Sequence, residues 1–176
     1  TDAEYATKGS LIKWNPAVKT QADRDAIRQA VIDDRIDVLA TDHAPHTIEE
    51  KAGNYWNAPS GGPLVQHALI AMLDMVDQGI FSYELIAKKA SYNVARRFKM
   101  KDRGLLQEGH WADMVLLSKN PYTVTDENIL SKCGWSPFTG HSFKHTVDQT
   151  YVNGHKVYDK GALCFTQLGQ RLSFNR

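Results

Sequence analysis

One stretch of the sequence, residues 35–47 (RIDVLATDHAPHT), constrains the fold more than any other. Residues 36–40 form a short, mainly apolar run, and its length suits a strand buried on both faces. Pro45 lacks the N–H that a strand ladder needs, so we expect this strand to end near Asp42. The carboxyl ends of the strands form the active face of parallel α/β folds, and Asp42 would lie there.

Asp42 is followed at once by His43 and, three residues later, by His46. A carboxylate and imidazoles at the end of a strand suit a metal site or acid–base chemistry. The alternative is an Asx-turn formed by Asp42, with two solvated histidines. The apolar run before Asp42 favours the site over the turn.

The first forty residues alternate between expected strands and an expected helix. Residues 10–14 (SLIKW) predict a short strand that ends before a proline. Residues 20–34 predict a helix, with Thr20 as its N-cap and an acid, Asp23, in its first turn. The strand at 36–41 follows after a short connection, so a parallel β-α-β pair is expected.

A long irregular segment, residues 43–62, separates this strand from the next helix and contains two prolines and three glycines. A loop of this length in a compact domain is usually functional or disordered. A helix is then predicted over residues 63–79, because Pro63 suits a first turn and Gly79 a C-terminal stop. His67 falls off the apolar stripe of that helix and is expected on the surface or at a rim.

The sequence becomes rich in strands in its second half. The expected elements are, in chain order, helices near 82–90 and 91–98, a strand at 112–117, a turn near 126–130, and strands at 145–154 and 155–161. Asn153-Gly154, between the last two strands, is a strong hairpin signal. The chain therefore divides into an α/β part, residues 1–103, and a β-rich part, residues 104–176. The histidines of the β-rich part, which we expect to be surface or structural residues, are His110, His141, His145 and His155.

Charge, hydropathy and cysteine usage exclude several classes of partner. The net charge of +1 argues against nucleic acid, and no apolar stretch reaches the roughly 20 residues that span a bilayer. Cys133 and Cys164 form no CxxC pair, and a reduced cytoplasmic protein is a simpler interpretation than a disulfide, which stays open. No signal peptide opens the chain, and its first residues, without a Met, look like the middle of a longer sequence.

Three segments together carry a resemblance to a known family: residues 15–19 (NPAVK), 40–46 (ATDHAPH) and 60–62 (SGG). In this order they resemble the N-P-P-L-R segment, the A-T-D-H-A-P-H segment and the glycine-rich substrate loop of dihydroorotase, in the amidohydrolase superfamily. The later segments SYNVARRF, GLLQEGHWADMVLL and KCGWSPFTGHSF are similar to further parts of its carboxy-terminal region, so the resemblance covers nearly the whole chain. D-H-A-P-H is specific to dihydroorotases and their nearest cousins, whereas A-D-x-V is common to many amidohydrolases.

The sequence departs from the family pattern around the substrate loop. Residues 17–19 read Ala-Val-Lys in place of Pro-Leu-Arg, and Ser60 replaces an aromatic residue. Residues 65–67 read Val-Gln-His in place of Leu-Glu-Thr, and Val94 replaces a helix proline. These changes concern the fine contacts of the loop and leave the D-H-A-P-H segment intact.

The resemblance implies an α/β fold: the last part of a (β/α)8 TIM-type, metal-dependent hydrolase barrel in residues 1–103, then strands of a small composite β-sandwich domain in residues 104–176. It implies a zinc-dependent dihydroorotase, which reversibly cyclises N-carbamoyl-L-aspartate to (S)-dihydroorotate in de novo pyrimidine biosynthesis. The expected partners are this small substrate and the remaining N-terminal part of the same enzyme, and a homodimer is compatible with the family. The cytoplasmic location expected from the cysteine usage is compatible with this resemblance.

The resemblance also implies a role for five residues. Asp42 would bind zinc and act as general acid–base, taking a proton from the attacking water and giving it to the leaving amide nitrogen. His46 and Asn15 would bind the carboxylate of dihydroorotate, and backbone groups of Ser60 and Gly61 would contact the pyrimidine ring. For Asn15 the alternative is a plain Asn-Pro turn, and for the glycine-rich loop it is a flexible segment without a ligand.

Most metal ligands of the family fall outside these 176 residues, because no H-x-H occurs here and the middle barrel strands are not represented. We therefore expect one or two zinc ions in the complete enzyme and an inactive isolated fragment: a proteolytic piece, a truncated chain or one half of a nicked enzyme. His43 is expected to form hydrogen bonds at the strand end rather than to bind metal. Lys19 would hold an anion in place of the family arginine, or would be solvated.

Two other functions compete with dihydroorotase. The first is another cyclic amidohydrolase, such as dihydropyrimidinase, hydantoinase or allantoinase, whose substrates lack the carboxylate that Asn15 and His46 would bind. The second is a non-catalytic dihydroorotase-like scaffold for aspartate transcarbamoylase, which the retention of Asp42 and His46 disfavours. A folded binding module that never formed a barrel is a third option, but unpaired parallel strands are poorly stable alone.

Overall fold

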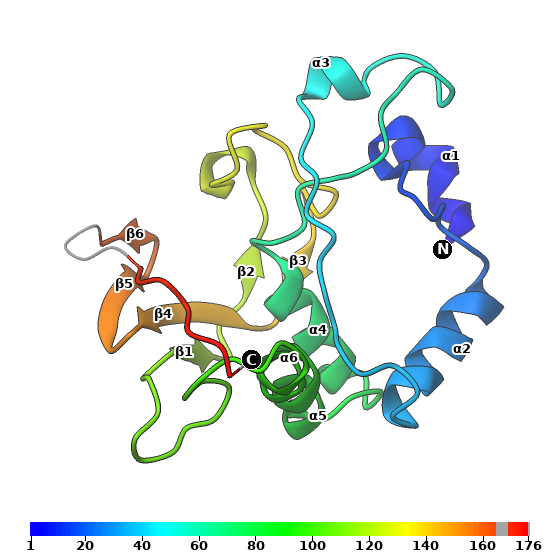
Figure 1. The fold of residues 1–176 in the computed structure, drawn as a ribbon. Helices are drawn as coiled ribbons and strands as arrows, with labels where there is room; N and C mark the ends of the chain where they lie inside the picture. Colours follow the sequence, from blue (N-terminus) through cyan, green and yellow to red (C-terminus); the bar gives the residue numbers. More distant parts are fainter. Residues whose placement is uncertain (165–168, 176) are drawn as a thin grey trace. The chain divides into compact units, whose positions relative to one another are not determined.

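The structure, a computed structural model, describes residues 1–164 and 169–175 of the 176-residue chain. The chain forms two compact units, each of them interrupted in sequence. The first comprises Thr1–Ile36, Ala40–Ala71 and Thr123–Ser142, and the second comprises Asp37–Leu39, Met72–Tyr122 and the described part of Phe143–Arg176. Figure 1 follows the course of the chain.

Short helices joined by irregular segments make up the first unit (Figure 1). They are η1 (Asp2–Glu4), α1 (Tyr5–Lys8), η2 (Gly9–Ile12), α2 (Gln21–Ile32), α3 (Ile48–Lys51) and η4 (Asp126–Asn128), where these three η elements are 3-10 helices. Its buried apolar residues are Ile12, Val31, Ala58, Ile70, Val124 and Trp135. They come from all three of its sequence segments, so this unit is held together by contacts between distant parts of the chain.

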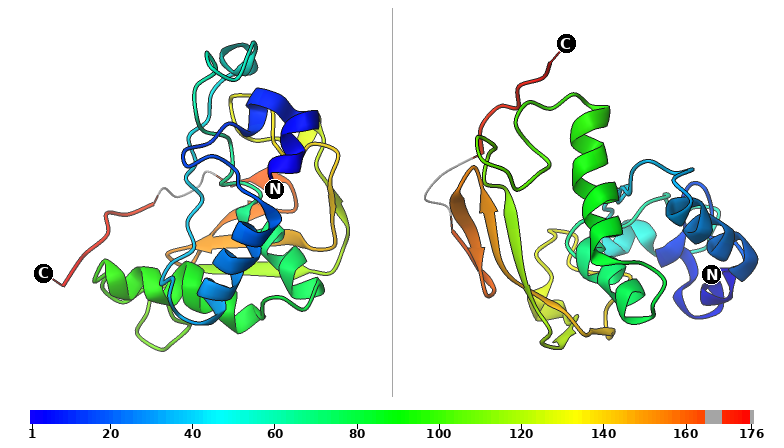
Figure 2. Two further views of the ribbon diagram at one scale, coloured as in Figure 1. Left: turned by 90° about the vertical axis from the view of Figure 1, so that its right-hand side faces the viewer. Right: turned by 90° about the horizontal axis from the view of Figure 1, so that it is seen from below.

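A run of helices and a four-stranded antiparallel sheet make up the second unit. The helices are the end of α4 (Ala68–Asp77), then α5 (Tyr83–Ala87), the π-helical turn η3 (Lys88–Tyr92) and α6 (Asn93–Arg97). The last three follow one another without a break and form one continuous rod (Figure 2, right). The sheet has the order β1-β4-β5-β6, from β1 (Met114–Ser118), β4 (Thr146–Val152), β5 (His155–Asp159) and β6 (Ala162–Leu163).

Two further strands, β2 (Tyr122–Thr123) and β3 (Ser142–Phe143), pair in a small separate sheet. The Thr123 and Ser142 hydroxyl oxygens lie 2.7 Å apart, and the Val124 N–H donates to the His141 carbonyl over 3.0 Å. Residues 123–142 therefore form a loop whose two ends are joined by hydrogen bonds.

Sequence-based predictions were confirmed for elements whose contacts join residues that are close together in the sequence. The helix predicted at 20–34 is α2, and the Thr20 side chain accepts from the Asp23 N–H while the Asp23 carboxylate accepts from the Thr20 N–H. The predicted hairpin joins β4 to β5, with positive φ at Asn153 (55°) and Gly154 (81°), the combination that a type I′ turn requires. The helices predicted near 82–90 and 91–98 are also confirmed, as a single rod.

Two predicted strands were wrong. Residues 10–14 fall mostly in the 3-10 helix η2, where the Lys13 N–H donates to the Ser10 carbonyl over 3.0 Å. Residues 36–41 are half-exposed or exposed and join no ladder in the described chain, so the expected parallel pair is absent there. The Leu39 N–H donates instead to the Lys89 carbonyl over 3.1 Å. A strand forms only where a neighbouring strand pairs with it through hydrogen bonds. The apolar pattern of a segment does not show whether such a neighbour is present.

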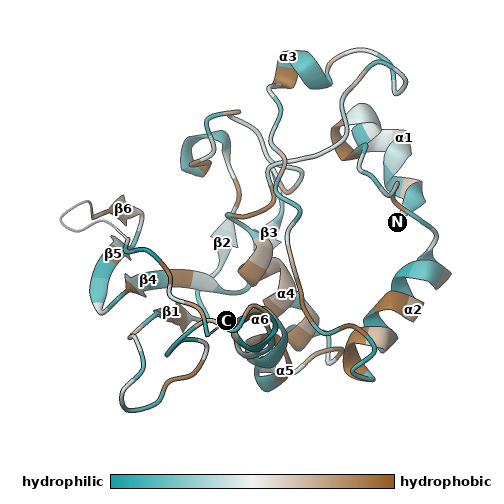
Figure 3. Ribbon diagram, viewed as in Figure 1, coloured by the Kyte–Doolittle hydropathy of each residue, from teal (hydrophilic) through white to brown (hydrophobic). Residues whose placement is uncertain are grey.

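Several apolar residues stay accessible to solvent, and Figure 3 shows how hydropathy varies along the elements. In α2, Ile27 is 56% and Ile32 is 42% exposed, although Val31 on the same helix is buried. In β1, Val115, Leu116 and Leu117 are all more than a third exposed, so the strand leaves apolar area uncovered on both faces. Within the described residues, no helix is long and apolar enough to cross a membrane.

Candidate active site

The predicted site residues after position 41 lie close to the two ends of the segment 43–62, which we call the excursion. Helix α3 lies at its tip (Figure 1). His43 and Gly62 form an isolated β-bridge, and the Ala44 N–H donates to the Gly62 carbonyl over 3.2 Å. The Trp135 Nε1–H donates to the His46 carbonyl over 2.8 Å and anchors the outgoing arm to the segment 123–142. Hydrogen bonds within the segment and from Trp135 therefore hold the stretch that was predicted to be a long irregular loop.

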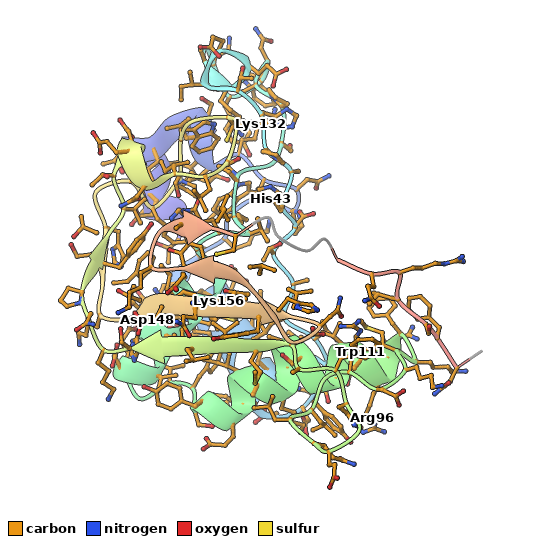
Figure 4. The ribbon with its side chains drawn as sticks, turned by 90° about the vertical axis from the view of Figure 1, so that its left-hand side faces the viewer. His43, Arg96, Trp111, Lys132, Asp148 and Lys156 are labelled. Atoms are coloured by element: carbon orange, nitrogen blue, oxygen red, sulfur yellow. The ribbon has the colours of Figure 1, made fainter. Side chains whose placement is uncertain are left out.

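His43, which is labelled in Figure 4, accepts hydrogen bonds from backbone N–H groups of residues that follow the glycine loop. Its Nδ1 accepts from the Leu64 N–H (3.0 Å) and from the Val65 N–H (3.2 Å). A nitrogen that accepts must present a lone pair, so these bonds use Nδ1 of His43 as an acceptor. This agrees with the expectation that His43 forms hydrogen bonds near the strand end.

His46 lies between two hydrogen-bond acceptors. Its Nε2 is 3.2 Å from the Ser60 carbonyl oxygen, and its Nδ1 is 3.3 Å from a Glu50 carboxylate oxygen. A neutral imidazole can donate to only one of these two acceptors, and its tautomer decides which. Glu50 is placed by the capping box of α3, in which its carboxylate also accepts from the Thr47 N–H.

The conformation and packing of the protein's own backbone require a glycine at position 61. Its φ is +126°, and an added Cβ would lie 2.5 Å from the Ala44 carbonyl oxygen. Its N–H donates to the Lys13 carbonyl over 3.0 Å, two residues before Asn15. Gly62 is also crowded, since a Cβ there would lie 2.9 Å from Trp14 Nε1. We expected these glycines to allow a ligand to come close to the backbone. In the structure, Ala44 and Trp14 of the protein itself lie close to them.

The structure brings some predicted site residues together and leaves others apart. His46 and Ser60 are linked directly, and Gly61 is linked to the segment that leads to Asn15. In the described chain, Asp42 and Asn15 form no hydrogen bond with the other candidates; Asp42 is exposed, with φ +46°, and Asn15 is exposed before a cis peptide bond to Pro16. Among residues 1–164 and 169–175, no group of three or more His, Cys, Asp or Glu side chains could hold a metal ion. The described residues alone therefore form no complete metal site.

His67 was predicted at the surface or at a rim, and this was wrong. It is 1% exposed, its Nδ1 lies 3.1 Å from the Ser136 hydroxyl, and its ring meets the Phe138 ring edge-on. The Ser136 oxygen also accepts from the Phe138 N–H over 3.2 Å. Burial lowers the pKa of His67 and so favours the neutral ring. The error arose because helix α4 begins at Ala68 and not at Pro63, so His67 lies in the preceding turn.

Two further polar side chains, those of His145 and Lys51, are buried. His145, 2% exposed, lies with Nε2 3.0 Å from the Tyr83 hydroxyl and Nδ1 3.3 Å from an Asp77 carboxylate oxygen, so it is structural rather than superficial. Lys51, which the sequence did not single out, is fully buried.

A cavity of about 410 Å³ in the second unit contains none of the predicted site residues. It is lined by Tyr92, Ala95, Arg96, Lys99, Met100, Arg103, Leu105, His110 and Asn175.

Residues 15–157 match the amidohydrolase family. The chain belongs to this family. Among curated relatives of this amidohydrolase chain, the dihydroorotase of Clostridium acetobutylicum is 40% identical over 161 residues, which are 90% of this chain and 38% of that protein. The allantoinase of Bacillus velezensis is 31% identical, over 90% of this chain and 35% of that protein.

Solved structures agree with this family assignment. The L-hydantoinase (dihydropyrimidinase) of Arthrobacter aurescens superposes with a TM-score of 0.92 at 26% identity, over 98% of this chain and 40% of that one. The α/β content and the amidohydrolase fold of this chain therefore match those of the hydantoinases. The chain spans a little over a third of the length of the relatives it matches.

Proposed function

We propose that this amidohydrolase chain is the carboxy-terminal part of a zinc-dependent dihydroorotase, which interconverts N-carbamoyl-L-aspartate and (S)-dihydroorotate in pyrimidine biosynthesis. The observation that carries the proposal is the setting of His46 in the D-H-A-P-H segment, between the Glu50 carboxylate and the Ser60 carbonyl. A ring nitrogen of His46 would donate to the substrate carboxylate in place of one of these two protein acceptors. Relatives named dihydroorotase, at 37–40% identity, support the same choice.

The residues of this chain would divide the work between binding and proton transfer. His46 and Asn15 would hold the substrate carboxylate, and the backbone at Ser60 and Gly61 would border the ring. Asp42 would take a proton from the attacking water and return it to the leaving amide nitrogen. Its carboxylate also suits a zinc ligand, although the other ligands of one or two ions would come from outside this chain. Zinc would supply a water molecule whose pKa is lowered towards neutrality.

The proposed domain organisation follows from the family. Residues 1–103 would be the last strands and helices of a (β/α)8 barrel, and residues 104–176 the strands of a composite β-sandwich. The uncovered apolar side chains of α2 and β1 support this, because such residues are normally covered by a neighbouring element. The N-terminal part of the same enzyme is the proposed cover. A homodimer and a cytoplasmic location are compatible with this proposal.

The decisive experiment uses the protein that the complete gene encodes, with zinc supplied. We expect turnover of dihydroorotate and N-carbamoyl-L-aspartate to exceed turnover of hydantoin and allantoin by at least about tenfold. Asp42→Asn should reduce kcat by at least about a hundredfold, the effect expected from removing a general acid–base. Asp102→Asn is the matched control, because Asp102 has a similar positive φ (54°) and is no site candidate. Unchanged kcat in Asp42→Asn would contradict the role of Asp42.

A hydantoinase-type or allantoinase-type enzyme is the second candidate. The superposition on the Arthrobacter aurescens L-hydantoinase and the identity with the Bacillus velezensis allantoinase favour it. Preference for hydantoin or allantoin in the assay above would establish this alternative. Binding of aspartate transcarbamoylase without turnover of any cyclic amide would instead indicate a scaffold.

A further inference from the structure

Lys51 is an unusual residue in the first unit, because its side chain is completely buried. It is the last residue of α3, and its ammonium donates three hydrogen bonds to backbone carbonyl oxygens. The distances are 3.2 Å to Lys13, 2.9 Å to Pro59 and 2.9 Å to Gly61. An ammonium has three N–H groups, so all of its donors are used.

This arrangement is not an ion pair. In the described part of the chain, no carboxylate forms a salt bridge with the Lys51 ammonium, whose charge is met by carbonyl dipoles. Burial, and then the nearby Lys13 ammonium, lower the pKa of Lys51. Burying a charge is costly unless it is hydrogen-bonded, and the three carbonyl oxygens supply those bonds. What an apolar side chain cannot do is bind three carbonyl groups at one point.

Those three carbonyls belong to the segments that carry the candidate substrate residues. Pro59 and Gly61 flank Ser60 on either side, and Lys13 lies two residues before Asn15. The Lys13 carbonyl also accepts from the Gly61 N–H over 3.0 Å, so the two segments are joined twice. The Lys51 carbonyl accepts from the Ser10 hydroxyl over 2.6 Å, which ties α3 to the same region.

We infer that Lys51 is a positioning residue for the substrate loop. By holding the Pro59 and Gly61 carbonyls, it fixes the peptide groups around Ser60 and therefore the surface that the backbone presents to substrate. By holding the Lys13 carbonyl, it fixes that loop against the segment that leads to Asn15. Its donors are all occupied, so Lys51 acts through these residues and does not touch the substrate. This inference rests on the proposed function, because it takes residues 59–61 as a substrate-binding segment.

The test is Lys51→Met in the complete gene product, because Met fills a similar volume without the ammonium. Lys132→Met is the matched control, since Lys132 is an exposed lysine of the same unit (Figure 4). We expect Lys51→Met to raise KM for dihydroorotate at least about tenfold while kcat changes less than about threefold. Amide hydrogen exchange of Gly61 should become at least about tenfold faster, because the bonds that close this segment are weakened. Lys132→Met should change neither quantity.

A milder variant, Lys51→Gln, keeps two N–H donors and guards against misfolding of Lys51→Met. It should give intermediate KM and intermediate exchange at Gly61. Wild-type KM together with wild-type exchange in a folded Lys51 variant would overturn the inference. Faster exchange with unchanged KM would also overturn it, because Lys51 would then be structural only. Should the wild-type protein turn over no cyclic amide, the proposed function fails by that result, while unchanged Gly61 exchange would separately refute the action of Lys51 on the loop.

Discussion

Replacing Gly61 by alanine tests whether the glycine loop is held by the chain itself. The backbone at Gly61 has φ +126°, a region that residues with a Cβ rarely enter. The new Cβ would lie 2.5 Å from the Ala44 carbonyl oxygen and 2.8 Å from the Ala44 Cβ. Both distances are too short, so the two arms of the excursion must separate or the backbone must change conformation.

The structure gives the size of this effect. Holding a non-glycine residue in such a conformation costs about 1–3 kcal/mol. Forcing extra atoms into a packed contact costs about 1–3 kcal/mol more, so Gly61→Ala should lower the free energy of unfolding by about 2–6 kcal/mol. Gly53→Ala is the matched control: its φ is also positive, at +99°, but an added Cβ would meet no atom within 4 Å. It should show the backbone cost of about 1–3 kcal/mol alone.

The assay is urea unfolding of the 176-residue chain, followed by tryptophan fluorescence and by far-UV circular dichroism. Both substitutions restrict the unfolded chain equally, so that contribution cancels when the two variants are compared. The contact at Ala44 is then the difference between their free energies of unfolding. Equal losses of stability in the two variants would refute the reasoning, because they would show that residues 44 and 61 are not in contact in solution.

Two further predictions concern stability away from this contact. Thr20→Ala should cost about 1 kcal/mol, because it removes the side chain that accepts from the Asp23 N–H at the start of α2, and urea unfolding should detect it. Because burial lowers the pKa of His67, the folded chain resists its protonation; stability should be highest above about pH 6.5, the ordinary value for histidine, and fall as the pH drops below it. His67→Gln keeps an acceptor for the Ser136 hydroxyl and should flatten that pH dependence, so an equally steep fall in this variant would contradict the assignment.

The elements that sequence could predict are those whose signals and partners are close together in the chain. Thr20 and Asp23 cap one another within a single helical turn, and Asn153-Gly154 sets its own hairpin. The segments 10–14 and 36–41 differ, because a strand depends on a partner from elsewhere in the chain. Apolar composition alone does not show whether such a neighbouring strand is present.

The same distinction applies to the candidate site. The D-H-A-P-H segment could be found in the sequence, and the structure links His46 to Ser60 as that grouping suggests. The burial of Lys51 could not be predicted, because lysines are almost never fully buried and its bonding partners lie up to 38 residues away. His67 was misplaced for a different reason: its position was judged on a helix assumed to begin five residues too early.

Many of the hydrogen bonds that hold the glycine loop come from nearby residues. Glu50 is placed by a capping box at Thr47, Lys51 binds the carbonyls of Pro59 and Gly61, and His46 lies beside the Ser60 carbonyl. The Lys13 carbonyl and the Trp135 indole supply further bonds, and both also belong to this chain. Asp42 has no comparable bonds in the described chain, and one carboxylate cannot hold zinc alone. It follows that the proposed site has two parts with different requirements: a substrate loop that this chain can preform, and a metal centre that depends on ligands from the rest of the barrel.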